Sequence, residues 1–207
     1  MKNSKKALIS LLCAAFCVLI YACASGGGSG GNAKAADTGP SELYGNWKLE
    51  PHDDSNDKGT SKITMTVADE VIDGKTVKTY TFKGEVTNKH IYGVVDATLT
   101  PDEETLAYLK TAKGISFKMK ADGRDYVIEA PTSDVKDWGF HRFKIKTEPG
   151  VVQQHDIQMR MFMQPSWATT VRFYQIHLQS IRIQTVNAAE GGMGPFEFKV
   201  WDIRLYK

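Results

Sequence analysis

Few side chains in this chain are spaced for catalysis. No two histidines form a His-x-x-x-His or His-Glu-x-x-His metal pair, and no Gly-x-Ser-x-Gly turn presents a nucleophilic serine. Only the fold can bring two carboxylates together, so no acid/base pair for glycoside hydrolysis can be assigned. The three cysteines, Cys13, Cys17 and Cys23, all lie near the start of the chain, which excludes cysteine enzymes and cysteine-rich metal sites from the rest. The sequence therefore favours binding over catalysis.

Several aromatic residues are candidates for stacking on sugar rings. Sugar recognition needs flat aromatic faces for C–H surfaces and planar polar groups for hydroxyls. The best candidate is Trp138, which lies between Asp137 and Gly139 in a polar loop, and its candidate partners are Trp167, Tyr174 and Tyr92. The aromatic residues expected in the core are Trp47, Trp201 and Tyr126. For Trp138, ligand binding and simple packing remain equal alternatives.

A row of polar side chains would complete such a site. Arginine and glutamine suit hydroxyl and carboxylate ligands. If their strands are neighbours, one surface carries Arg142, Gln158, Arg160, Arg182 and Gln184. A half-exposed antiparallel sheet also carries polar residues on its solvent side without binding anything, and this alternative is favoured.

An acidic loop offers oxygen ligands to a hard cation. Its residues are Asp53, Asp54, Asn56 and Asp57. The glycine and closing glutamate spacing of a helix-loop-helix calcium site is missing. Because such residues also form ordinary turns, a solvated surface loop is the favoured interpretation.

The N-terminal segment predicts export. Lys2, Lys5 and Lys6 precede an apolar run over residues 7–22, which is typical of a signal peptide; a retained transmembrane anchor is the alternative. The run ends in Leu-Ile-Tyr-Ala-Cys, which resembles a bacterial lipobox with Tyr21 in place of a small residue. The resemblance implies lipidation of Cys23, and Ala24 and Ser25 after it favour the outer membrane over the inner membrane of a bacterial cell envelope.

Three regions follow from this division of the chain. Residues 1–22 are the signal peptide, and residues 23–41 are the lipidated cysteine with a Gly/Ser-rich flexible tether. Residues 42–207 are the folded domain. Without the three signal lysines, 23 basic residues stand against 24 acidic ones, so charge gives no reason to expect a nucleic-acid partner.

The elements that must position these residues are mainly β-strands. Turn signals recur about every ten residues, which favours a β-sandwich or barrel over βαβ units. One short helix is expected after Thr100 as N-cap and Pro101 as its first residue. Strands are predicted at residues 42–50, 62–68, 76–87, 91–99, 140–147, 156–163, 170–178, 180–186 and 195–206.

Three of these segments carry more detailed expectations. Residues 113–130 read as a β-hairpin, with Gly123 in its turn and Asp125 and Glu129 on its wet side. In residues 156–163, methionines at every second position predict a core-facing strand, with Met159, Met161 and Met163 inward. In residues 195–206 the alternation slips at Val200 and Trp201, as at a β-bulge.

Four short motifs, in order, resemble the complex I intermediate-associated protein 30 family and the related family 11 carbohydrate-binding modules. They are Gly114-Ile115-Ser116-Phe117, Asp122-Gly123-Arg124-Asp125-Tyr126, Gln164-Pro165-Ser166-Trp167, and Pro195-Phe196 with Asp202-Ile203. Gly59-Thr60-Ser61 and Phe82-Lys83-Gly84 also match the pattern. A tryptophan that the family often carries is absent from residues 149–152.

The resemblance implies an all-β, galactose-binding-like jelly roll of two antiparallel sheets with one short connector helix. It implies a glycan on a concave sheet, and no cofactor except a structural calcium held by Asp202 with Glu42 or Glu50. The sequence thus predicts a lipid-anchored, non-catalytic carbohydrate-binding module with Trp138, Trp167, Tyr174, Tyr92, Arg160, Gln158 and Arg142 as candidate ligand contacts. The alternative is a module of the cell envelope that binds a protein partner and no glycan.

Overall fold

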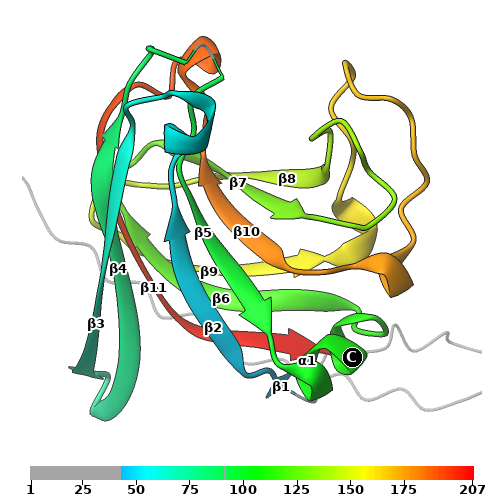
Figure 1. The fold of residues 1–207 in the computed structure, drawn as a ribbon. Coiled ribbons are helices and arrows are strands. Elements are labelled where there is room, and N and C mark those ends of the chain that lie inside the picture. The colour runs from blue at the N-terminus through cyan, green and yellow to red at the C-terminus, as the bar shows by residue number, and fades with distance from the viewer. Residues whose placement is uncertain (1–42, 91) are drawn as a thin grey trace, which may run out of the picture. The chain divides into compact units, whose positions relative to one another are not determined.

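Two antiparallel sheets pack face to face in the computed structural model, which describes residues 43–90 and 92–207 (Figure 1). The six-stranded sheet has the order β3-β4-β11-β6-β9, with β1 paired to β11. Its strands are β1 (Leu43–Tyr44), β3 (Lys62–Ile72), β4 (Lys75–Val86), β6 (Gly114–Ala121), β9 (Val152–Gln158) and β11 (Gly194–Tyr206). This confirms one half of the predicted sandwich.

The five-stranded sheet has the order β2-β5-β10-β7-β8. Its strands are β2 (Trp47–His52), β5 (Asp96–Pro101), β7 (Asp125–Ala130), β8 (His141–Lys146) and β10 (Ile181–Thr185). The helical pieces are α1 (Glu103–Leu109) and the 3-10 turns η1 (Asp54–Asp57), η2 (Met159–Met161), η3 (Gln175–His177) and η4 (Ala188–Glu190). The predicted all-β jelly roll with one short helix is therefore confirmed.

The N-terminal predictions fall outside the described part of the chain. The signal peptide, Cys23, the tether and Glu42 all belong to residues 1–42. Within the described ranges, no helix has the length and apolar character needed to cross a membrane.

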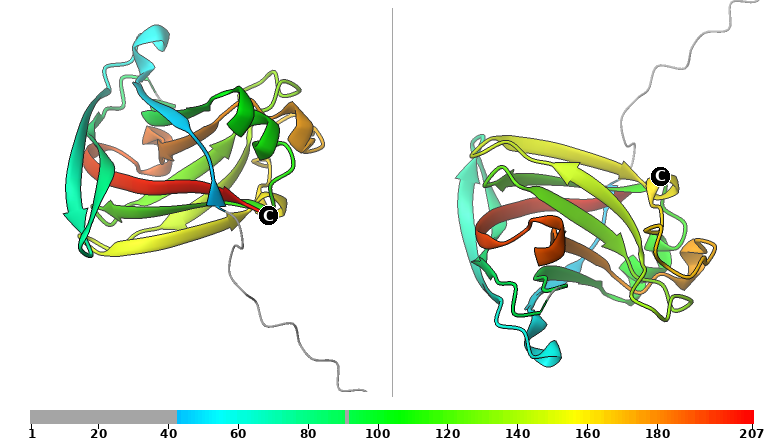
Figure 2. Two further views of the ribbon diagram at one scale, coloured as in Figure 1. Left: turned by 90° about the horizontal axis from the view of Figure 1, so that it is seen from below. Right: turned by 90° about the horizontal axis from the view of Figure 1, so that it is seen from above.

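The core lies between the sheets and is centred on β11. Figure 2 shows β11 in the middle of its sheet, where it pairs with β4 on one side and β6 on the other. The ring of Phe198 stacks on Phe82 at 5.0 Å and meets Tyr126 of the opposite sheet edge-on, also at 5.0 Å. All three side chains are almost completely buried. Aromatic contacts of this kind join the two sheets.

The predicted hairpin at residues 113–130 is wrong in its pairing. Its two strands, β6 and β7, belong to different sheets, so the turn at residues 122–124 carries the chain across the sandwich. Gly123 has φ 95°, as that turn requires. The Asp122 carboxylate accepts hydrogen bonds from the Tyr126 hydroxyl and the Arg124 Nε, and Arg124 also donates to the carbonyls of Gly192 and Pro195. These contacts fix the crossing.

Other boundaries also differ from the predictions. The predicted first strand is interrupted at Gly45 and Asn46, residues 92–95 precede β5 as a loop, and residues 170–178 contain only η3. The helix cap is Asp102, whose carboxylate accepts from the Thr105 amide, while Pro101 ends β5. The predicted slip in the last strand is confirmed, since the β11–β6 register shifts between Trp201 and Arg204.

The methionine stripe is wrong for two of its three members. β9 ends at Gln158, and η2 then changes the direction of successive side chains. Met159 is buried, but Met161 and Met163 are 42% and 72% exposed, and Phe162 takes the core position instead. Backbone hydrogen bonds pair Met163 with Arg142, so the chain has moved to the edge of the five-stranded sheet.

Candidate functional site

The candidate site is the outer face of the five-stranded sheet, meaning the side that points away from the core. Leu49, Leu99, Ile181, Ile183 and Ile128 point inward and are buried. Since side chains alternate along a strand, their neighbours point outward. The register aligns one outward residue from each strand into a single row across the sheet: Glu50, Thr98, Arg182, Glu129 and Arg142. The face is therefore lined by polar and charged groups.

Arg182, Glu129 and Arg142 form the centre of this row. Nη1 of Arg182 lies 4.0 Å from Oε2 of Glu129. Nη2 of Arg142 lies 3.8 Å from Oε1 of Glu190, at the end of η4. The guanidinium of Arg182 also lies 5.3 Å from the ring centroid of Phe140, a cation–π contact. Both arginine side chains keep about a quarter of their surface exposed.

Glu129 is the most perturbed acid on this face. Its side chain is 9% exposed, and burial raises the pKa of its carboxyl to about 7. Asp96 raises the pKa further, while Arg182 and Arg142 lower it. Desolvation thus outweighs two nearby arginines, because a charged carboxylate loses its water here.

A second outward row begins with an ion pair. Nδ1 of His52 lies 3.5 Å from Oδ1 of Asp96, and the hydrogen bond to Asp96 raises the pKa of the His52 imidazole. The Thr98 hydroxyl donates to the same Asp96 oxygen at 2.6 Å. The register continues this row through Gln184 and Val127 to Lys144.

Two exposed tryptophans stand on loops at one end of the outer face. Trp138 lies between β7 and β8 and is 73% exposed, and Trp167 lies between η2 and η3 and is 62% exposed. Figure 1 shows both loops rising together at the β8 end of the sheet. The ring of Trp138 meets Phe140 edge-on at 6.2 Å, which links it to the stack under Arg182.

Two polar side chains tie these loops together. The Asp137 carboxylate accepts from the Thr169 amide at 2.7 Å and from the Gly139 amide at 3.1 Å. The Gln164 amide donates to the carbonyls of Gly139 and Thr169 and accepts from the Val171 amide. The hydrogen bond from Thr169 lowers the pKa of Asp137, so this carboxylate stays ionised over a wide pH range. Both tryptophans are therefore held on one cross-linked structure.

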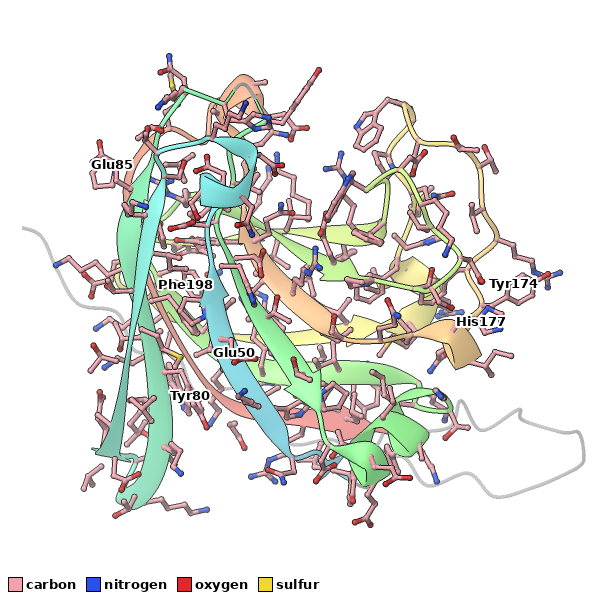
Figure 3. The ribbon with its side chains drawn as sticks, viewed as in Figure 1. Glu50, Tyr80, Glu85, Tyr174, His177 and Phe198 are labelled. Carbon is pink, nitrogen blue, oxygen red and sulfur yellow. The ribbon has the colours of Figure 1, made fainter. Side chains whose placement is uncertain are left out.

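The other two aromatic candidates, Tyr174 and Tyr92, are exposed but take no part in the hydrogen bonds that tie the two loops together. Tyr174 is 44% exposed, between the Arg172 guanidinium at 5.2 Å and the His177 ring at 5.7 Å. Figure 3 shows Tyr174 and His177 on one loop, across the sheet from Glu50 on β2. Tyr92 is 65% exposed and lies in the loop before β5, at the opposite strand end from Trp138.

The predicted polar row is right for three residues and wrong for two. Arg142, Arg182 and Gln184 share the outer face. Gln158 instead ends β9 of the other sheet, and Arg160 in η2 donates its Nε hydrogen bond to Gln158. The sequence places these two residues on the face only because it predicts a single strand through residue 163.

A small cavity adjoins the outer face at the end away from Trp138. It has a volume of about 240 Å³ and lies between β7, β8 and the loop after β10. Arg124, Asp125 and Lys144 line one side, and Glu190 to Met193 line the other.

The described residues at Asp202 do not fit the predicted calcium ion. Its carboxylate lies 2.5 Å from Nε of Arg204 and 4.0 Å from Nζ of Lys118, so two cations already neutralise it. Glu50 pairs with Lys48 at 2.7 Å instead. Within residues 43–90 and 92–207, no three histidine or acidic side chains gather as a metal site would need. Glu42 lies outside those residues.

Several residues of the face are not predicted from the sequence as site residues, among them His52, Asp96, Glu129 and Phe140. Glu129 was expected to be wet because it alternates with apolar residues. Only the pairing of β7 between β10 and β8 shows that neighbours cover it. His52 and Asp96 are 44 residues apart, and no local pattern links them.

The chain resembles known proteins in sequence and in fold. The family model of Complex I intermediate-associated protein 30 (CIA30) matches residues 36–200. Among solved structures, the chain is similar to the family 11 carbohydrate-binding module of a cellulosomal cellulase from Clostridium thermocellum. Identity is 14%, 80% of this chain and 89% of that chain are covered, and the TM-score is 0.52, which supports the jelly-roll fold.

Two family 29 carbohydrate-binding modules are more distant in fold. They are 11% and 13% identical, cover 71% and 70% of this chain and 81% and 88% of theirs, and have TM-scores of 0.36 and 0.34. No curated protein matches the chain.

Proposed function

This chain belongs to the Complex I intermediate-associated protein 30 family, and from that premise we propose that it is a non-catalytic module that binds a carbohydrate on the outer face. The strongest support comes from the exposed tryptophans Trp138 and Trp167. Two tryptophans, 73% and 62% exposed, are displayed on loops that Asp137 and Gln164 hold together beside a polar sheet. Exposed aromatic side chains gathered beside polar groups mark interaction and ligand-binding sites.

The outer face supplies the rest of what a sugar needs. Arg182, Gln184 and Arg142 offer hydrogen-bond donors, and Asp96, Thr98 and Glu129 offer acceptors, all on strands. Strands hold the backbones of these residues at fixed positions, so their side chains are placed more precisely than side chains on loops.

The carbohydrate proposal is tested by binding measurements on Trp138→Ala. A glycan array first identifies a ligand, and titration calorimetry then compares the purified wild-type protein with the variant. We expect about 10- to 100-fold weaker binding, the range for a central aromatic contact. Val71→Ala is the matched control, because Val71 is 75% exposed on β3 of the other sheet.

Two results would count against the proposal. One is a glycan ligand that the wild-type protein and Trp138→Ala bind with the same affinity. That result would show that the tryptophan loops are not part of the site. The other is no glycan ligand at all together with specific recovery of a protein from envelope extracts. That outcome would favour a protein-interaction module, for which the exposed apolar side chains of Met163 and Ile176 are suited.

We also propose that the protein is lipid-anchored in the bacterial cell envelope through Cys23, in the outer membrane. The basic start, the apolar run and the Gly/Ser-rich tether support this. Intact-mass analysis of protein purified from its native membrane is expected to show a chain that begins at Cys23 and carries acyl mass. A chain that begins at Met1, or one without acyl mass, would contradict the anchor.

A further inference from the structure

Two guanidinium groups at the centre of the outer face have unused hydrogen-bond donors. An arginine side chain carries five N–H donors, and buried or half-buried donors are normally paired. In the described structure, neither the Arg182 nor the Arg142 side chain makes a hydrogen bond. Their nearest acids are Glu129, 4.0 Å from Arg182, and Glu190, 3.8 Å from Arg142, which are ion-pair distances only. Nε of Arg182 is buried without a partner.

The other acids near these arginines already have closer partners. Glu50 pairs with Lys48 at 2.7 Å, and Asp125 pairs with Lys144 at 3.0 Å. Asp96 accepts from the Thr98 hydroxyl and faces His52. The two arginines therefore keep N–H donors that these acids do not accept from.

Geometry also favours a planar anion here. Arg182 and Arg142 lie on β10 and β8, on either side of β7, and both are directly opposite Glu129. The Arg182 guanidinium lies over the Phe140 ring, which limits its rotation. A guanidinium fixed in this way presents paired N–H groups that match the two oxygens of a carboxylate.

We propose that the carbohydrate bound here carries a carboxylate, as a uronic acid does, and that Arg182 and Arg142 bind that carboxylate. This inference rests on the proposed carbohydrate function and specifies its ligand class. The tryptophan loops at the end of the face would then stack on sugar rings next to the acidic one.

Glu129 couples this binding to pH. Its carboxyl, with a pKa raised to about 7 by burial, loses its negative charge as the pH falls, and Arg182 then no longer has a charged partner in Glu129 and is free for the ligand. The charged groups that face it are Arg182 from β10, Arg142 from β8 and Asp96 from β5, with Glu190 and His52 behind them. His52 also gains charge at lower pH, so a Glu129 variant is needed to separate the two effects.

The test compares acidic oligosaccharides with their own methyl esters. Oligomers of galacturonate, glucuronate and mannuronate, each beside its ester, are titrated calorimetrically into the purified protein at pH 6 and pH 8. We expect at least one acid form to bind about tenfold or more tightly than its ester at pH 6, since charge-assisted bonds are lost in the ester. Arg182→Gln and Arg142→Gln should each bring the acid form close to the ester.

Control variants separate this inference from the general function. Arg204→Gln, on the other sheet, should leave the preference for the acid form unchanged. In Glu129→Gln, the affinity for the acid form should change less between pH 6 and pH 8 than in the wild-type protein, and the change that remains is the contribution of His52. An unchanged pH dependence in this variant would exclude Glu129 as the coupled group. Equal binding of acid and ester, still weakened by Trp138→Ala, would overturn this inference and keep the carbohydrate function. Binding of no saccharide in any form would overturn both.

Discussion

Replacing Phe198 by alanine is expected to lower the free energy of unfolding by about 3–5 kcal/mol, the range for removing a buried aromatic side chain. Phe198 lies on the central strand of the six-stranded sheet and is 1% exposed. Its ring stacks on Phe82 within its own sheet and meets Tyr126 of the opposite sheet, each at 5.0 Å. Alanine would therefore remove ring contacts both within the six-stranded sheet and between the two sheets.

Urea unfolding of the purified protein measures this effect. Val71→Ala is the control, because Val71 is 75% exposed and its truncation should change the free energy by no more than about 0.5 kcal/mol. A loss below about 1 kcal/mol for Phe198→Ala would mean that neighbouring rings fill the space, and the packing between the sheets would then be looser than described.

The class of fold could be predicted from sequence because alternation is local. β6, β8 and most of β11 were found from apolar residues at every second position, which is the direct signature of a strand with one buried face. The partner of each strand is not local information. The turn at residues 122–124 has the composition of a hairpin turn, but hydrogen bonds from Arg124 join it to the carbonyl of Gly192 in a distant loop and to the carbonyl of Pro195 at the start of β11. They direct β7 to the other sheet.

The same limit explains the error at the methionines. Met159, Met161 and Met163 alternate in sequence as a core strand would. The chain, however, leaves one sheet at Gln158 and joins the edge of the other at Met163, next to Arg142. A change of sheet resets which residues point inward, and no property of the three methionines indicates it.

The family motifs predicted the fold better than the site. The described contacts give most of their polar residues a structural role. Asp122 and Arg124 fix the crossing between the sheets, Gln164 holds two loops together, and Ser61 donates to the buried carboxylate of Asp54. That carboxylate was expected in a solvated loop, and it is instead 5% exposed. The residues that we propose as ligand contacts on the outer face, such as Arg182, lie between these motifs.

The site could be predicted in part, from residue types that are unusual in their setting. Trp138 was found because a tryptophan in a polar loop has few ways to be buried. Glu129 could not be found, because its surroundings come from three strands that are distant in sequence. Its burial is also the source of the second large effect that we expect.

Glu129→Gln is expected to remove a pH dependence of stability. In the folded state the pKa of Glu129 is about 7, against a usual value of 4.5. Between about pH 4.5 and pH 7, Glu129 keeps its proton in the folded protein but has released it in the unfolded chain. The unfolding free energy should therefore be highest below about pH 4.5 and fall as the pH rises through about 7. Each unit of difference between the two pKa values corresponds to about 1.36 kcal/mol. Ionisation of Glu129 should therefore lower the unfolding free energy by about 3 kcal/mol in total.

Glutamine keeps the shape of the side chain and cannot ionise. At pH 5 the variant should match the wild-type protein, and at pH 8 it should be more stable by up to about 3 kcal/mol. Urea unfolding at pH 5, 6, 7 and 8 measures both curves. Glu50→Gln is the matched control in the same row of the sheet. Glu50 is 42% exposed and its pKa is lowered by the hydrogen bond from Lys48, so this variant should keep the wild-type slope. Wild-type and Glu129→Gln curves that run parallel would show that Glu129 is already ionised in the folded protein, and that water or a shift of Arg182 compensates its charge.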